Sequence, residues 1–83
     1  MATKDDLVDW VFEALESLGG RGTIVEVCRC MWSKHETELR DSGDLFYTWQ
    51  YDMRWAAQKL RDTGRAKPQD ACPKGVWELS SHV

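Results

Sequence analysis

The hydrophobic and polar positions of this chain repeat with helical spacing in three separate stretches. In the first, residues 4–18, apolar residues recur three or four positions apart, which is the spacing of one helix face. These apolar residues are Leu7, Val8, Val11, Leu15 and Leu18. Thr3 and Asp6 suit the N-terminal end of a helix, and Gly19 and Gly20 favour a stop at its C-terminal end. We therefore predict a helix over residues 4–18.

The second stretch, residues 24–39, is preceded by the sequence of a capping box. Thr23 can accept a hydrogen bond from a free backbone N–H of the first turn, while Glu26 can reach back to the backbone N–H of Thr23. The expected inner face consists of Val27, Cys28, Met31, His35 and Leu39. The pattern predicts a helix over residues 24–39, and the polar run 40–44 is typical of a turn.

The third stretch, residues 45–63, has the clearest two-sided pattern. Projected at 100° per residue, its apolar positions fall within roughly 80° of one another, so we expect them to be buried. These positions are Leu45, Trp49, Met53, Ala56 and Leu60. The opposite side carries Tyr47, Gln50, Tyr51, Arg54, Gln58 and Arg61. Ser42 or Asp44 is expected to cap this helix, and Gly64 to end it.

The last stretch, residues 65–80, has strand signals in place of helical ones. Residues 65–67 lead to Pro68 and a turn, and residues 76–80 alternate apolar and polar side chains with period two. Two such segments joined by a turn predict a β-hairpin.

The order of these elements predicts the fold class. Trp77 and Leu79 share one face of the second expected strand, which should pack on the helices. Residues 19–22, rich in glycine, are interpreted as a helix stop and a tight turn. Three helices followed by a two-stranded β-hairpin predict a single α+β domain over residues 1–83. This is a winged helix-turn-helix, with the hairpin as its wing.

Size and composition agree with one small domain. The chain has 83 residues, 42% of them hydrophobic, and five tryptophans supply much of the apolar surface that a core needs. No apolar run approaches the roughly 20 residues of a membrane span, and the first residues lack the order of a signal peptide. Three cysteines, an odd number, argue against a disulfide framework. We expect a cytoplasmic protein.

The charge distribution bears on the choice of partner. The net charge is −3, whereas nucleic-acid-binding domains usually carry a basic excess. Residues 1–41 hold nine acidic and five basic side chains, a net charge of −4. Residues 42–83 hold five acidic and six basic side chains, a net charge of +1. A polyanion would therefore have to bind the second half of the chain.

Metal binding and catalysis are not expected. Cys28 and Cys30 stand two positions apart on a helix and point in roughly opposite directions, so they cannot easily hold one ion with His35 or Cys72. Cys28 is better interpreted as a small buried apolar residue. The carboxylates are scattered along helix surfaces, and no nucleophile stands near a histidine at a telling spacing. We expect no cofactor, no metal and no enzymatic activity.

Two segments give the sequence a family resemblance. Residues 53–64 read Met-Arg-Trp-Ala-Ala-Gln-Lys-Leu-Arg-Asp-Thr-Gly, and residues 75–79 read Gly-Val-Trp-Glu-Leu. Together they resemble the N-terminal winged-helix domain of Mrr-type restriction systems. The resemblance implies a bacterial or phage DNA-binding domain with a role in regulation or defence. The nuclease domain that usually follows in that family is not part of these 83 residues, so no cleavage activity is implied.

The polar side of the helix over residues 45–63 suits recognition of double-stranded DNA. Arginine can make paired hydrogen bonds to guanine and glutamine to adenine when a helix enters the major groove, while tyrosine and lysine bind phosphates. The candidate residues on this helix are Tyr47, Thr48, Gln50, Tyr51, Arg54 and Gln58. On the wing they are Arg65, Lys67 and Lys74, which could hold the neighbouring DNA backbone.

Aromatic residues on the same helix support a different interpretation. Tyr47 and Tyr51 lie outside the buried stripe, and Trp55 lies at its border. A continuous aromatic patch marks a protein interface, so the alternative is a protein-interaction or dimerisation module, including a homodimer. Trp55 could instead cover the core beneath the helix over residues 24–39 or beneath the wing. The two functions are compatible, because many helix-turn-helix proteins bind DNA as dimers.

Overall fold

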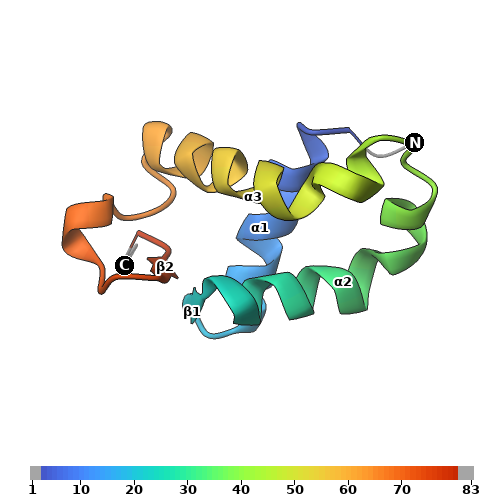
Figure 1. Cartoon of the computed structure of the whole chain (residues 1–83). Coiled ribbons are helices and arrows are strands. Elements are labelled where there is room, and N and C mark those ends of the chain that lie inside the picture. Colours follow the sequence, from blue (N-terminus) through green and yellow to red (C-terminus); the bar gives the residue numbers. More distant parts are fainter. Residues whose placement is uncertain (1–2, 81–83) are drawn as a thin grey trace.

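The computed structural model of the chain describes residues 3–80 and contains three α-helices and a two-stranded sheet (Figure 1). In chain order the elements are α1 (Asp6–Ser17), β1 (Arg21–Thr23), α2 (Ile24–Arg40), α3 (Leu45–Asp62), the short 3₁₀ helix η1 (Gln69–Ala71) and β2 (Val76–Glu78). Helix α1 packs against both α2 and α3, and the sheet lies at one end of the three helices.

The C-terminal end of α1 and the start of α2 follow the local signals closely, whereas the N-cap of α1 is Asp5, which makes no side-chain capping bond, and not Thr3. Gly19 and Gly20 have positive φ angles of 87° and 99°, and the backbone N–H of Gly20 donates to the carbonyl of Leu15 at 2.7 Å, which closes the end of α1. At the start of α2 both hydrogen bonds of the predicted capping box are present: Glu26 N–H donates to Thr23 at 3.1 Å, and Thr23 N–H donates to the Glu26 carboxylate at 2.8 Å. These contacts define the end of α1 and the start of α2, on either side of β1.

The start of α3 differs from its predicted cap. Asp44 occupies the N-cap position but makes no side-chain capping bond, and Ser42 is buried with its hydroxyl donating to the carbonyl of Leu39. Ser42 therefore closes the C-terminal end of α2 and does not cap α3. The two helices are joined by a short connection that is held from the α2 side.

Helix α2 is distorted at His35, whose φ and ψ of −127° and 21° are not helical. The imidazole stacks on the indole of Trp10, with ring centroids 4.0 Å apart. Its Nε2 lies 3.0 Å from a carboxylate oxygen of Glu13, and its Nδ1 lies 3.0 Å from one of Glu38. His35 thus joins α2 to α1 by stacking and hydrogen bonding, as an inner-face residue that is only partly buried.

The prediction of a C-terminal hairpin after three helices is wrong. The sheet pairs β1, which lies before α2, with β2 in antiparallel register, so that Arg21 faces Glu78 and Gly22 faces Trp77. Residues 65–67 contribute only an isolated bridge, Ala66 to Leu79. The physical reason is that Pro68 cannot donate a ladder hydrogen bond and η1 follows it directly.

Strand β1 was missed because the glycine-rich run 19–22 also has the composition of a turn. Its three residues are too few to show an alternating pattern. Gly22 is buried, and a Cβ atom there would come within 2.8 Å of the end of the Leu18 side chain, which would have to move to make room for it. Gly22 therefore belongs to a strand, although the glycines around it are typical of a loop.

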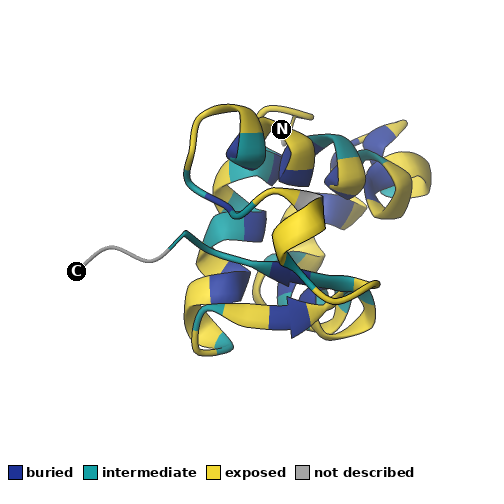
Figure 2. Cartoon of the chain, turned by 90° about the vertical axis from the view of Figure 1, so that its left-hand side faces the viewer, coloured by how far each residue is buried: buried dark blue, intermediate teal, exposed yellow. Residues whose placement is uncertain are grey.

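The core lies where the three helices and β2 meet (Figure 2). All five residues of the predicted apolar stripe of α3 are buried: Leu45, Trp49, Met53, Ala56 and Leu60. Helix α1 contributes Leu7, Val11, Ala14 and Leu15, and α2 contributes Val27, Met31 and Leu39. Trp77 of β2 is 7% exposed and Leu79 is partly buried, so the predicted inward face of this strand packs on the helices. With its inner stripe buried, α3 presents its opposite side to solvent.

The capping box provides a stability test of the β1–α2 junction. Replacing Thr23 by alanine removes the acceptor for the Glu26 N–H, and we expect a loss of about 1 kcal/mol in the free energy of unfolding. Urea denaturation measures this difference. The control is Thr37→Ala, an exposed position inside α2, where alanine should leave stability unchanged or slightly higher. Equal effects of the two substitutions would contradict the assignment of the cap.

Candidate nucleic-acid interface

The solvent-facing side of α3 brings together the six helix residues predicted from the sequence. Tyr47, Thr48, Gln50, Tyr51, Arg54 and Gln58 are all exposed. Two of them have internal partners, since the hydroxyl of Thr48 donates to Asp52 at 2.8 Å and the amide of Gln58 donates to Asp62 at 3.0 Å. Gln50 and Arg54 make no side-chain hydrogen bond within residues 3–80, so their polar groups are available to a partner.

A groove between α3 and the loop before β2, which we call the wing groove, has a volume of about 190 Å³. It is lined by Ile24, Arg54, Arg61, Pro73, Gly75, Val76 and Trp77. Arg54 and Arg61 stand two turns apart on the same side of α3. Neither forms an ion pair in the part of the chain that the structure describes. The groove thus combines apolar side chains with two guanidinium groups that have no ion-pair partner within residues 3–80.

Sequence reasoning placed Arg61 on the polar side of the helix but did not include it among the candidate binding residues. Its spacing from Arg54 was the available signal, because positions seven apart share one helix face. Lys74 is exposed between η1 and β2, next to Pro73 and Gly75 of the wing groove, and has no ion-pair partner within residues 3–80. Arg54, Arg61 and Lys74 therefore supply the unpaired positive charge around this groove.

The structure places the two other predicted wing residues elsewhere. Lys67 Nζ lies 2.8 Å from a carboxylate oxygen of Glu78, and together they line a hollow on the side of α1. Arg65 lies over the Phe12 ring of α1, 4.8 Å from its centroid, with one guanidinium nitrogen 3.9 Å from Asp9. Both residues are turned toward α1 and do not join the exposed side of α3.

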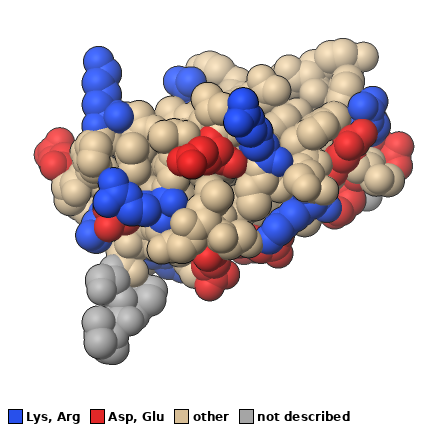
Figure 3. Space-filling model, turned by 90° about the horizontal axis from the view of Figure 1, so that it is seen from below, with Lys and Arg blue, Asp and Glu red and all other residues tan. Residues whose placement is uncertain are grey.

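The charges on the face that α2 contributes to are mixed. The face seen from below in Figure 3, on the side of α2, carries basic and acidic side chains interspersed. On α2, Arg40 is engaged with Glu36, with 2.8 Å between nitrogen and oxygen. A mixed surface offers no continuous positive potential to a polyanion, so the wing groove is the better site for one.

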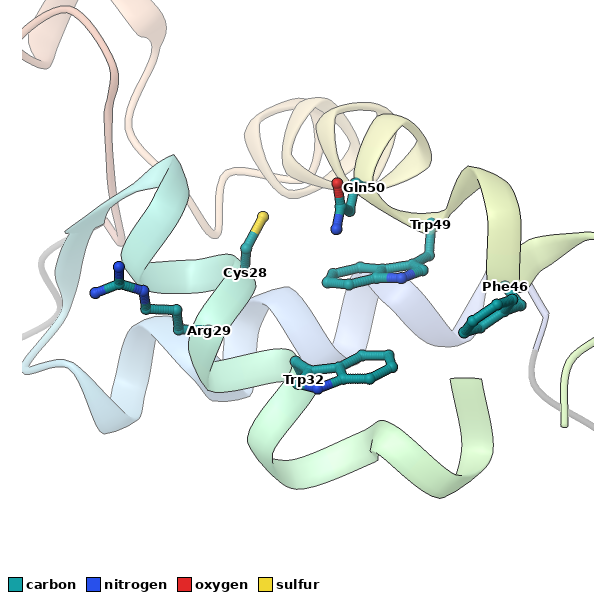
Figure 4. A pocket seen from close by; sticks show the side chains of 6 residues that line it. All are labelled: Cys28, Arg29, Trp32, Phe46, Trp49 and Gln50. Atoms are coloured by element: carbon teal, nitrogen blue, oxygen red, sulfur yellow. The ribbon is translucent and has the colours of Figure 1, made fainter. Parts of the chain in front are cut away.

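A second concavity, the aromatic hollow, lies between α2 and α3 and has a volume of about 380 Å³ (Figure 4). It is lined by Cys28, Arg29 and Trp32 of α2 and by Phe46, Trp49 and Gln50 of α3. The indoles of Trp32 and Trp49 are nearly parallel, with centroids 6.0 Å apart and an interplanar angle of 10°. Burial raises the pKa of the Cys28 thiol, and the nearby Arg54 guanidinium opposes that rise.

Trp55 and Cys28 pack against the core and, among the described residues, do not form part of a metal site. Trp55 is partly buried against the core, with the ammonium groups of Lys4 and Lys59 at 4.5 and 5.4 Å from its ring centroid. It therefore packs on the core with two lysine side chains over its ring. Cys28 is only partly buried, and its sulfur lies 3.2 Å from that of Met53. Within residues 3–80 no three histidine, cysteine or carboxylate side chains gather as a metal site would require.

Comparison of the chain with protein-family models, with curated proteins and with solved structures finds no match. The resemblance of residues 53–64 and 75–79 to the Mrr-type N-terminal domain thus stays a prediction. No helix among the described residues is long and apolar enough to cross a membrane.

The Lys67–Glu78 ion pair gives the stability of the fold a testable dependence on pH. The hydrogen bond from Lys67 is the main cause that lowers the pKa of Glu78 below its ordinary value of 4.5, with a smaller contribution from the charge of Arg21. The ionised carboxylate therefore stabilises the fold at neutral pH, and this contribution is lost as the pH falls below that ordinary value. In an NMR titration, Lys67→Met should raise the pKa of Glu78 more than Arg21→Gln does. The reverse order would show that Lys67 is not its partner.

Proposed function

We propose that this chain is a winged-helix domain that binds double-stranded DNA, with the exposed side of α3 in the major groove and the wing on the phosphate backbone. In this proposal α2 and α3 form the helix-turn-helix, and the wing is the loop over residues 68–75. Pairing of β1 with β2 supports this arrangement, since it anchors the end of that loop to the start of α2: the N–H of Ile24 donates to the carbonyl of Gly75 at 3.3 Å.

The wing groove is the observation that carries the proposal. Arg54 and Arg61 have no carboxylate partner within residues 3–80, and Lys74 stands next to the groove, near the end of the wing that leads into β2. Guanidinium and ammonium groups in such a position bind backbone phosphates, which fix the register of a protein on the duplex. The net charge of −3 does not prevent this, because the acidic excess resides in residues 1–41.

Base recognition is assigned to the first half of α3. The amide of Gln50 lies on the exposed side of the helix without an internal partner, and glutamine can pair with the edge of adenine. Tyr47 and Tyr51 flank it and are suited to phosphate or base contacts. The resemblance to the Mrr-type N-terminal domain is consistent with such a role in bacterial or phage regulation or defence.

The salt dependence of duplex binding tests this proposal. Binding of a mixed-sequence duplex should weaken steeply between about 50 and 200 mM salt, because each neutralised phosphate releases counterions. Arg54→Gln and Arg61→Gln should each reduce the slope of log K against log salt by about 1. The matched control is Arg40→Gln on α2, whose guanidinium is paired with Glu36 and which should leave the slope unchanged. A salt-independent affinity, or equal effects of all three substitutions, would refute the proposal.

A second candidate function is self-association through the tyrosines of α3. Tyr47 and Tyr51 are 82% and 79% exposed and stand one helical turn apart, and the ring of Phe46 contacts that of Tyr47 edge-on at 5.1 Å. Large exposed aromatic side chains gathered on one helix are typical of interfaces. A homodimer formed there would also present two DNA-binding helices to two half-sites.

Sedimentation equilibrium tests this candidate. If the tyrosines form the interface, wild-type protein should sediment as a dimer at micromolar concentrations, and Tyr47→Ser with Tyr51→Ser should sediment as a monomer. The stability of the fold should not change, since both side chains are exposed. Wild-type protein that remains monomeric at the highest soluble concentration would exclude this interface and leave DNA binding by a monomer.

A further inference from the structure

The aromatic hollow between α2 and α3 has a composition that DNA binding does not explain. Trp32, Phe46 and Trp49 form apolar walls, and the amide of Gln50 points toward the space between Cys28 and Trp49 (Figure 4). The Gln50 side chain makes no hydrogen bond within residues 3–80. A concave, mostly apolar site with a few polar groups at its margin is the usual form of a small-ligand site.

The size of the hollow limits the ligand. Its volume of about 380 Å³ is close to the lower end of the roughly 300–1,000 Å³ range of such sites. A ligand with one aromatic ring and a short chain fits this space, whereas a larger cofactor does not. The flat walls formed by two indoles and a phenyl ring favour a planar apolar body, because aromatic rings pack edge-to-face or offset against one another.

The charged side chains around the hollow indicate which polar group a ligand would carry. Arg29 lines the hollow and extends away from the ring walls at the end where Cys28 lies (Figure 4). Arg54 of α3 lines the adjoining wing groove together with Ile24, which stands one helical turn before Cys28 on α2, and its positive charge opposes the rise in the pKa of the Cys28 thiol. Neither arginine is ion-paired within residues 3–80, and no carboxylate lines the hollow. This end is thus complementary to an anion, and arginine binds carboxylates with two parallel hydrogen bonds.

From these observations we infer that the aromatic hollow binds a small aromatic carboxylate, with the ring among Trp32, Phe46 and Trp49 and the carboxylate between Arg29 and Arg54. Arg54 also lines the wing groove, so that a bound carboxylate competes with a DNA phosphate for the same guanidinium group. This competition rests on the proposed DNA-binding function, whereas the ligand site itself does not. The ligand would act as an inhibitor of duplex binding.

The test of the site uses a matched pair of probes, 3-phenylpropionate and its neutral amide, 3-phenylpropionamide. Each is titrated into ¹⁵N-labelled protein while the indole N–H resonances are recorded. We expect the signals of Trp32 and Trp49 to shift and those of Trp10 to stay. The carboxylate should bind about tenfold more tightly than the amide, because only the carboxylate gains charge-assisted hydrogen bonds.

Three variants separate the charge effect from simple apolar binding. Arg29→Gln and Arg54→Gln should each remove most of the preference for the carboxylate over the amide. Arg21→Gln, an exposed substitution in β1 at a residue that does not line the aromatic hollow, should retain the preference. Equal affinities of the two probes for wild-type protein, or shifts that spare Trp32 and Trp49, would overturn the inference.

A last measurement addresses the competition. Saturating 3-phenylpropionate should weaken binding of the mixed-sequence duplex by wild-type protein, whereas the amide at the same concentration should not. Unchanged duplex affinity with the hollow occupied would overturn the shared role of Arg54. If no duplex binds under any condition, the proposed DNA-binding function fails, and the carboxylate preference measured without DNA still decides whether the ligand site exists.

Discussion

The antiparallel pairing of β1 with β2 is the constraint on which the arrangement of the candidate site depends. It joins a three-residue strand near the start of the chain to another near its end, with α2 and α3 between them in sequence. The backbone of Ile24, the first residue of α2, donates to Gly75, so the loop before β2 is tied to the start of that helix. This tie closes one side of the wing groove. The other side is α3, whose buried stripe fixes the direction of Arg54 and Arg61.

Helix α3 consequently belongs to three environments at once. One side supplies the core, including Met53, a second contributes Arg54 to the wing groove, and the first turns contribute Phe46 and Trp49 to the aromatic hollow. Because α3 is a single rigid helix, a partner that engages one of these surfaces acts close to the others. The proposed nucleic-acid and ligand sites meet at Arg54, and Gln50, a proposed base contact, also lines the hollow. Such a shared side chain is a simple physical basis for coupling two binding events.

The sequence predicted the parts of the fold that depend on local periodicity. The three helices and the buried stripe of α3 follow from apolar spacing, and the cap at Thr23 follows from a short motif that acts within one turn. The partner of β2 was not predictable in this way, because β1 is short and strand pairing depends on contacts distant in the sequence. The helix residues of the candidate site could be found together because they share one periodic pattern. The positions of Arg65 and Lys67 could not be predicted in this way, because their partners on α1 and β2 are set by tertiary packing.

The central claim is that duplex DNA binds across α3 and the wing. Resonance mapping of ¹⁵N-labelled protein with a mixed-sequence duplex at about 50 mM salt tests it most directly, because phosphate contacts are strongest at low salt. The account predicts that the side-chain signals of Arg54, Arg61 and Lys74 shift while those of Arg65 and Lys67 stay in place. Signals of Arg54 and Arg61 that do not move, or shifts concentrated on the outer side of α1, would contradict it.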